Sequence, residues 1–233
     1  WAGALLGLGT ATSLYPALLL VPLLVLCARQ DRWTPAVRAV AGATFAWLVV
    51  NLPVMLAAPG GWAYTLTSNR DGGADLGSAW YVLDGLGVPL GDVSLLAVAT
   101  LALGVIGVAA LLWFAPSPPR LAQGAFLVVV LFCLVNGAYS PQNALWLLPL
   151  LVLARPVRLD LAVFTAGELV YWLAIWPYLD GALFAGDGRP VLYWVAVAVR
   201  VGVQVWVGWR VARDVRHPWE DPVRGGEGVW RAP

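Results

Sequence analysis

Lysine is absent from the 233 residues, and charged residues of either sign are scarce. Only 12% of the residues are charged, about half the share of an ordinary soluble domain, whereas 61% are hydrophobic. The net charge of +1 gives no sign of a nucleic-acid or acidic partner. Apolar stretches recur along the whole chain, so one buried core cannot account for them. These features exclude a single soluble domain and predict a membrane protein.

Cysteine and histidine are scarce as well. Cys27 and Cys133 stand far apart, and neither has a second cysteine near it. A disulfide framework or a cysteine metal site needs pairs or clusters, so we interpret both as small apolar residues. The single histidine, His217, follows the last predicted helix in a basic run and is given no role. No cofactor is predicted.

The apolar stretches predict an all-α, polytopic membrane helix bundle with about seven transmembrane helices. The predicted spans are residues 2–26, 36–58, 93–115, 121–135, 144–154, 159–179 and 191–209. Residues 1–217 form the predicted bundle, and the polar residues 218–233 form a loose cytoplasmic tail. Because an apolar helix follows Trp1 at once, without a basic leader or cleavage site, we expect the C-terminal part of a longer protein.

The placement of arginine predicts the orientation. With the Trp1 end extracytoplasmic, eleven of the 14 arginines fall in cytoplasmic segments. Arg70 and Arg189 then lie in outer loops, and Arg200 lies inside a span. This bias is the positive-inside pattern. It predicts a multi-pass protein of the plasma membrane whose C-terminus is cytoplasmic.

The first long outer loop, residues 59–92, carries a polar cluster that includes Asn69, Arg70, Asp71 and Asp75. An amphipathic aromatic stretch around Trp80 follows it and is suited to the membrane surface. Loops of this length in compact proteins are usually functional or disordered. The aromatic side chains favour an ordered loop.

A second polar segment, residues 136–143, lies between two short spans. Counted from Ser140 to the residue before Arg155, a helix covers only about 21 Å of the roughly 30 Å hydrocarbon layer, which predicts a turn sunk into the outer leaflet. Ser140 followed by Pro141 is typical of a helix start, where free N–H groups attract an anion. A plain tight hairpin between two short helices remains the alternative.

Two charges are predicted inside the membrane. Glu168 and Arg200 each lie nine residues into adjacent spans, so both fall near the midplane and can pair. A brace that fixes helix register is the favoured interpretation. A substrate or proton site, as in a transporter, is the alternative.

Three segments together resemble glycosyltransferase family 87 of the GT-C class, the polyprenol-phosphate-mannose-dependent mannosyltransferases of actinobacteria. They are GTATSLYP at residues 9–16, SNRDGGADLGSAWY at 68–81 and YSPQNALWLLP at 139–149. Ser13 and Asn143 depart from the family pattern, which usually has lysine at the first position and often tyrosine at the second.

The resemblance implies a GT-C-like fold and a cell-envelope enzyme. It implies inverting transfer of a sugar, mannose, from a polyprenyl-phosphate donor to a lipid or glycan acceptor at the extracytoplasmic face. The remaining alternatives are a multi-pass transporter and an inactive membrane scaffold.

The resemblance also implies site residues. The catalytic base is expected in an outer loop before Trp1, with Asp75 as a weaker candidate. Arg70 would neutralise the leaving phosphate, and Asp75 would hold sugar hydroxyls, a role for which Asp71 is disfavoured. No metal is predicted, since two carboxylates four residues apart are weak evidence for one. The predicted substrate-binding set is Arg70, Asn69, Asp75, Tyr139, Ser140, Gln142 and Asn143.

Overall fold

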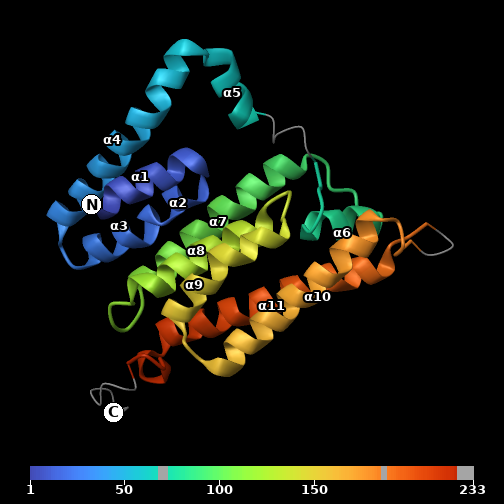
Figure 1. Cartoon of the computed structure of the whole chain (residues 1–233). Coiled ribbons are helices and arrows are strands. Elements are labelled where there is room, and N and C mark those ends of the chain that lie inside the picture. The colour runs from blue at the N-terminus through green and yellow to red at the C-terminus, as the bar shows by residue number, and fades with distance from the viewer. Residues whose placement is uncertain (68–72, 185–187, 225–233) are drawn as a thin grey trace.

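The computed structural model describes residues 1–67, 73–184 and 188–224. Within these ranges the secondary structure is helical and no strand occurs (Figure 1). The elements in order are α1 Ala2–Thr12, α2 Tyr15–Leu18, α3 Leu20–Arg29, α4 Trp33–Ala57, α5 Pro59–Thr67, α6 Ala79–Gly85, α7 Val93–Trp113, α8 Leu121–Val135, η1 Pro141–Asn143, α9 Ala144–Ala154, α10 Arg158–Leu179, α11 Val191–Arg216 and η2 Pro218–Glu220.

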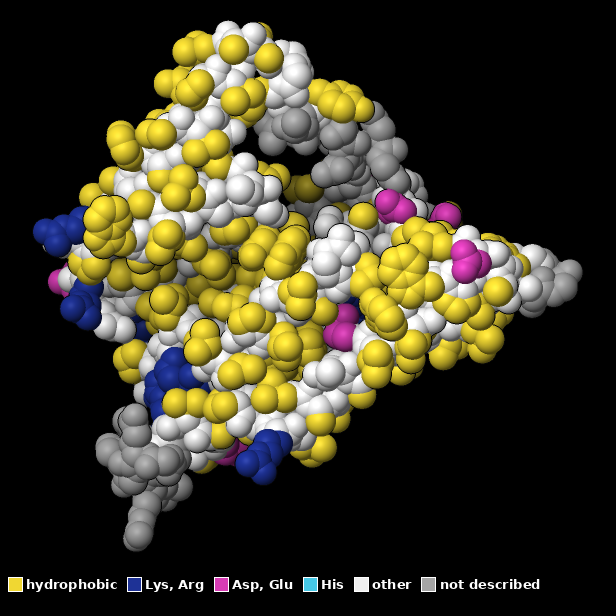
Figure 2. Space-filling model, viewed as in Figure 1, with side chains coloured by type: hydrophobic (Ala, Val, Ile, Leu, Met, Phe, Trp, Pro, Cys, Tyr) yellow, Lys and Arg dark blue, Asp and Glu magenta, His cyan; other side chains and the backbone are white. Residues whose placement is uncertain are grey.

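The predicted all-α membrane bundle is confirmed. Helices α4, α7, α10 and α11 are long and apolar enough to cross a membrane, and shorter apolar helices accompany them. Six of the seven predicted spans coincide with α4, α7, α8, α9, α10 and α11, apart from shifts at their ends. Hydrophobic side chains cover most of the face shown in Figure 2, as expected for a surface that faces lipid.

The first predicted span, residues 2–26, is wrong as a single helix. The chain leaves α1 at Ser13, whose backbone is extended, and α2 begins with Pro16 in its first turn. Proline has no N–H for a continuing helix, and the Thr10 hydroxyl donates to the Leu6 carbonyl at 2.7 Å. Helices α1 and α3 therefore form a bent pair.

Helix α1 runs parallel to α4, because Gly3 and Gly7 lie against the backbone of Ala39 and Ala43. A Cβ at either glycine would collide with α4, so the absence of a side chain permits this close approach. The Trp1 end consequently lies where α4 begins, at the same end of the bundle as the C-terminal part of α11 (Figure 1). The predicted placement of the two chain ends on opposite sides is not what the structure has.

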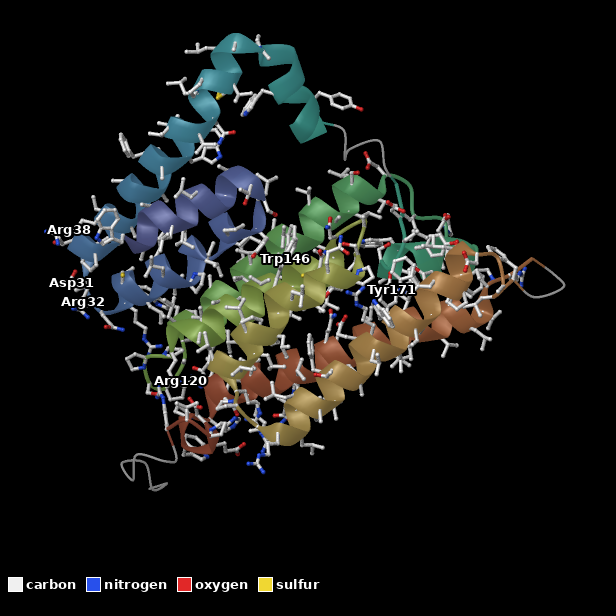
Figure 3. All side chains as sticks on the ribbon, viewed as in Figure 1. Asp31, Arg32, Arg38, Arg120, Trp146 and Tyr171 are labelled. Carbon is white, nitrogen blue, oxygen red and sulfur yellow. The ribbon has the colours of Figure 1, made fainter. Side chains whose placement is uncertain are left out.

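Arginine side chains gather at this end of the bundle. Figure 2 shows dark blue side chains along its left and lower edge, and Figure 3 labels Arg32, Arg38 and Arg120 there. Arg29 at the end of α3 donates to the carbonyls of Leu112 at 2.7 Å and Ala115 at 2.5 Å. It thus satisfies carbonyls at the end of α7, which have no partner in the helix itself.

Residues 218–224, predicted to belong to a loose tail, pack against this end. Asp221 is buried and accepts two hydrogen bonds from Arg120, each at 2.9 Å. Arg120 also donates to the carbonyls of Leu153 and Ala154 at the end of α9. Asp221 therefore neutralises an arginine that already caps another helix.

Helix α8 occupies the centre of the bundle. Its residues from Gln123 to Val130 are all buried, and Phe126, Val128 and Val129 have no exposed surface. Neighbouring helices α3, α7, α9 and α11 pack around it. Because α8 lies at the centre, the polar segment that follows Val135 begins in the core of the bundle and not at its surface.

Candidate functional site

A cavity of about 610 Å³ opens where this segment meets α10. Its volume lies within the usual range for small-molecule sites. The walls come from residues 75–76, from the segment 138–142, from the start of α9 and from one face of α10. The lining residues are Asp75, Leu76, Ala138, Tyr139, Ser140, Pro141, Gln142, Leu145, Tyr171, Trp172, Ile175, Trp176 and Leu179.

The segment 136–143 is a non-helical turn that reaches deep into the bundle. Arg200 donates to the carbonyl of Tyr139 at 2.9 Å and to that of Ser140 at 3.1 Å. Arg200 lies nine residues into α11, about 14 Å of helix rise below the start of that helix, and its side chain reaches these carbonyls from there. This geometry agrees with the depth expected from the short spans on either side.

Ser140 occupies the N-cap position, with Pro141 directly after it, and the helix opens as the 3₁₀ turn η1 before α9. Within the part of the chain that the structure describes, its hydroxyl makes no capping hydrogen bond. It donates instead to Oδ1 of Asn143, at 3.3 Å. The backbone therefore begins a helix after Ser140 as predicted, but the Ser140 side chain does not cap it.

Glu168 and Arg200 form an ion pair at 2.9 Å, and Arg200 is fully buried. The guanidinium carbon lies 3.5 Å from the ring centre of Tyr139 and 4.2 Å from that of Tyr171. One turn further along α11, Gln204 donates to the Tyr139 hydroxyl at 2.7 Å and to Glu168 at 2.5 Å. The pair is thus part of a network centred on Tyr139.

The outer-loop segment around Asp75 is hydrogen-bonded to the same turn. The Asp75 N–H donates to the Gly137 carbonyl at 2.8 Å, and the Tyr139 N–H donates to the Leu76 carbonyl at 3.0 Å. Gly77, which directly follows Leu76, has a φ of +76°, and a Cβ there would collide with the Tyr139 carbonyl and the Tyr171 hydroxyl. Glycine is therefore required at this position both by backbone conformation and by space.

Helix α6 holds this loop against α10 and α11 through aromatic side chains. The hydroxyls of Tyr81 and Tyr178 are 2.5 Å apart, and the ring of Tyr178 stacks on that of Tyr193 at 4.1 Å. Burial and the hydrogen bond to Tyr178 raise the pKa of Tyr81 to about 12. Through its hydroxyl contact with Tyr178, Tyr81 anchors α6 to α10.

The cavity has two chemically different halves. Asp75, Ser140 and Gln142 supply polar groups at the turn. Leu145, Trp172, Trp176 and Leu179 form an apolar wall on α9 and α10, and each is between 47% and 69% exposed. Exposed apolar side chains of this kind suit contact with lipid chains. The cavity is therefore amphipathic and open at the side.

Four predicted substrate-binding residues meet at this cavity, namely Asp75, Tyr139, Ser140 and Gln142. Asn143 is buried beside Ser140 and does not line it. Asn69, Arg70 and Asp71 lie outside the described residues, and so does the Asp71–Asp75 spacing considered for a metal. In the ranges described, no group of three or more potential metal-ligating side chains occurs.

The α10 wall was missed as part of the site by the sequence analysis. Tyr171, Trp172, Ile175 and Trp176 follow Glu168 at spacings of three, four, seven and eight, which place them on one side of a helix. That periodicity was the available signal. Near the outer end of a span, however, tryptophan is typical of an interfacial anchor, so Trp176 does not by its type indicate a site.

Two of the three recognised segments also touch each other. The rings of Tyr15 and Trp146 stack, with centres 4.2 Å apart and planes at 20°. Trp146, labelled in Figure 3, lies on α9 three residues after Asn143. This stacking fixes the bend after α1 to α9, the helix that follows the turn at Ser140.

Comparison with known proteins finds a family whose sequence model matches the chain. The sequence model described as Glycosyltransferase family 87 matches residues 1–137, which is more than half of the 233-residue chain. The match includes the α1–α3 bend and the Asp75 loop and ends just before Tyr139. No curated protein and no solved structure matches the chain.

Proposed function

Because this chain belongs to glycosyltransferase family 87, we propose that it transfers mannose from a polyprenyl-phosphate donor to a lipid or glycan acceptor at the extracytoplasmic face of the plasma membrane. The transfer inverts the configuration at the anomeric carbon. Family membership supports a membrane glycosyltransferase; the donor, the sugar and the side of the membrane are the proposal.

The observation that supports this donor is the amphipathic cavity. An isoprenyl phosphate joins a charged headgroup to a long apolar chain. The turn at Ser140 and Gln142 offers polar groups below the outer end of α11, and the exposed wall from Trp172 to Leu179 offers an apolar surface along the bilayer. A soluble nucleotide sugar has no lipid chain that could contact such an apolar wall.

In the proposed reaction an acceptor hydroxyl oxygen attacks the anomeric carbon of the mannosyl group. The bond from that carbon to the phosphate oxygen breaks, and polyprenyl phosphate leaves with the bonding electrons. A carboxylate takes the hydroxyl proton. Asp75 is the carboxylate that the described residues bring to the cavity, so it either accepts this proton or holds sugar hydroxyls.

Arg70 is assigned to the leaving phosphate, because a guanidinium matches phosphate geometry with two parallel hydrogen bonds. It lies outside the described residues, and the assignment rests on its place in the segment 68–81. The start of η1 and α9 is assigned as a second phosphate contact through its N–H groups.

Transport through the Glu168–Arg200 pair receives less support. Arg200 directs its N–H groups to Glu168 and to two main-chain carbonyls, and both Glu168 oxygens accept hydrogen bonds. Groups committed to one another in this way are not arranged to receive a substrate.

The test measures transfer of labelled mannose from polyprenyl-phosphate-mannose by the intact protein in membranes. If Asp75 is the base, Asp75→Asn lowers kcat by about 100-fold or more, the scale of general-base catalysis. If it holds sugar hydroxyls, the loss is closer to tenfold, the effect of about one hydrogen bond. The matched control, Asp84→Asn, changes an exposed carboxylate on α6 outside the cavity and should retain activity.

Arg70→Ala should abolish transfer and leave membrane insertion intact. Normal transfer by this variant would remove Arg70 from the mechanism. Wild-type protein that transfers mannose from a nucleotide sugar, and not from the lipid donor, would overturn the proposed function.

A further inference from the structure

The main-chain carbonyl groups of Tyr139 and Ser140 need hydrogen-bond donors from elsewhere in the bundle. They belong to non-helical backbone at membrane depth, where an unpaired carbonyl is costly. Both accept hydrogen bonds from Arg200, which lies 61 positions after Tyr139 and 60 after Ser140 in the chain. The shape of the turn is therefore fixed from α11 and not only by its own sequence.

Arginine suits this task because its planar group presents several donors in a rigid fork. Nη1 and Nη2 of Arg200 bond to two successive carbonyls, while Nε bonds to Glu168. Its flat faces contact the rings of Tyr139 and Tyr171. A lysine ammonium, a single point of charge, cannot hold two carbonyls and a carboxylate in this plane.

The network fixes Tyr139 from every side. Its carbonyl and ring contact Arg200, its hydroxyl accepts from Gln204, and its N–H donates to the Leu76 carbonyl. Ser140 and Gln142, two of the polar residues that line the cavity, lie one and three residues further along the chain. Any shift of Tyr139 would move them.

We propose that Arg200 is a positioning residue for the donor site: by holding the Tyr139 and Ser140 carbonyls it places the polar end of the cavity where the donor phosphate binds. Glu168 neutralises its charge, and Gln204 holds the Tyr139 hydroxyl. The donor named here rests on the proposed function, whereas the control of the turn by Arg200 rests on the contacts alone.

The test compares Arg200→Lys with Arg155→Lys in the intact protein in lipid nanodiscs. Arg155 is also buried and ion-paired, but its partners Asp160 and Asp214 lie at the other end of the helices. Two measurements are made on each variant: amide hydrogen exchange of residues 136–143, and KM and kcat for polyprenyl-phosphate-mannose.

Arg200→Lys should speed exchange in residues 136–143 and raise KM for the donor by about tenfold, the scale of one hydrogen bond to a charged group. The change in kcat should be smaller. Arg155→Lys should lower the melting temperature without altering either the exchange of the turn or KM. Gln204→Met should speed exchange at the turn by a smaller factor. If Arg200→Lys does not fold, this variant tests whether the network around Arg200 holds the turn.

Unchanged exchange at residues 136–143 in the folded Arg200→Lys protein, or in Gln204→Met if only that variant folds, would overturn the proposal. So would a loss of activity that follows only the amount of folded protein, with KM unchanged, since Arg200 would then be a brace for the fold. Faster exchange together with a wild-type protein that does not use polyprenyl-phosphate-mannose would refute the proposed donor and leave the positioning of the turn standing.

Discussion

The two ends of the bundle each bury an arginine, but they use it differently. Near the arginine-rich end, Arg155 pairs with Asp160 and with both oxygens of Asp214, the latter at 2.5 and 2.6 Å. All three residues are buried. At the cavity, Arg200 has one carboxylate partner and gives its other hydrogen bonds to main-chain carbonyls.

The difference lies in what each arginine holds. Arg155 sits between α9 and α10, and its aspartates lie on α10 and α11, so the cluster joins regular helices by their side chains. Arg200 holds the backbone of a turn whose own residues cannot satisfy it. We therefore expect damage at Arg155 to appear as lost stability, and damage at Arg200 itself to appear mainly as lost function.

The largest effect is expected from breaking the Arg155 cluster. Arg155→Ala leaves Asp214 buried without its ion-pair partner. Among the described residues Asp160 then keeps Arg210 alone, at 4.0 Å. Breaking comparable buried pairs costs about 3–5 kcal/mol. Unfolding in mixed detergent micelles measures the loss. Arg158→Ala, an exposed arginine three residues away, is the control and should change stability by less than about 0.5 kcal/mol. Equal losses in the two variants would show that the cluster does not join the helices.

Gly77→Ala should damage the cavity end almost as strongly. Left-handed backbone alone costs about 1–2 kcal/mol for a residue with a Cβ. Gly87→Ala, with a φ of +83° and, among the described residues, no heavy atom within 4 Å of the added Cβ, reports that cost by itself.

At Gly77 the collision with Tyr139 and Tyr171 should add about 1–3 kcal/mol, the usual cost of overpacking. It should also reduce sugar transfer, which Gly87→Ala should leave intact. Identical stability and activity in the two variants would mean that the Asp75 loop does not depend on its contact with the turn.

Glu168→Gln sharpens the comparison because it removes a charge and keeps a hydrogen-bond acceptor. Arg200 retains two carbonyls and two aromatic faces, so the expected loss of stability in detergent is about 1–2 kcal/mol, below that of Arg155→Ala. Melting curves and transfer rates are measured together. Loss of transfer without loss of stability would assign Glu168 a part in the reaction.

Much of this architecture was predictable, because membrane depth leaves few solutions. Hydrophobic runs predicted six helices, and two short spans predicted a turn below the surface at Ser140. Counting nine residues into each of two adjacent spans placed Glu168 and Arg200 at one depth, where they pair.

Other features depended on contacts between distant segments. Residues 2–26 read as one apolar run, and only the packing of Gly3 and Gly7 on α4 shows that α1 runs parallel to α4. Hydropathy carries no information about such a bend. The carbonyl partners of Arg200 were equally hidden, since main-chain acceptors have no signature in a sequence.

The smallest effect is expected at Ser140, where the sequence predicted a helix cap. Removing a capping hydroxyl typically costs about 1 kcal/mol. Among the described residues this hydroxyl reaches only Asn143, at 3.3 Å, and Arg200 holds the main-chain carbonyl that alanine also has. Ser140→Ala should therefore cost less than about 0.5 kcal/mol.

Ser78→Ala is the matched control, since the Ser78 hydroxyl caps α6 by accepting from the Tyr81 N–H at 3.1 Å and also donates to the Asp75 carbonyl at 2.7 Å. It should cost about 1–2 kcal/mol. Unfolding of both variants measures the difference. A loss at Ser140 as large as that at Ser78 would mean that the side chain, and not Arg200, holds the start of this helix.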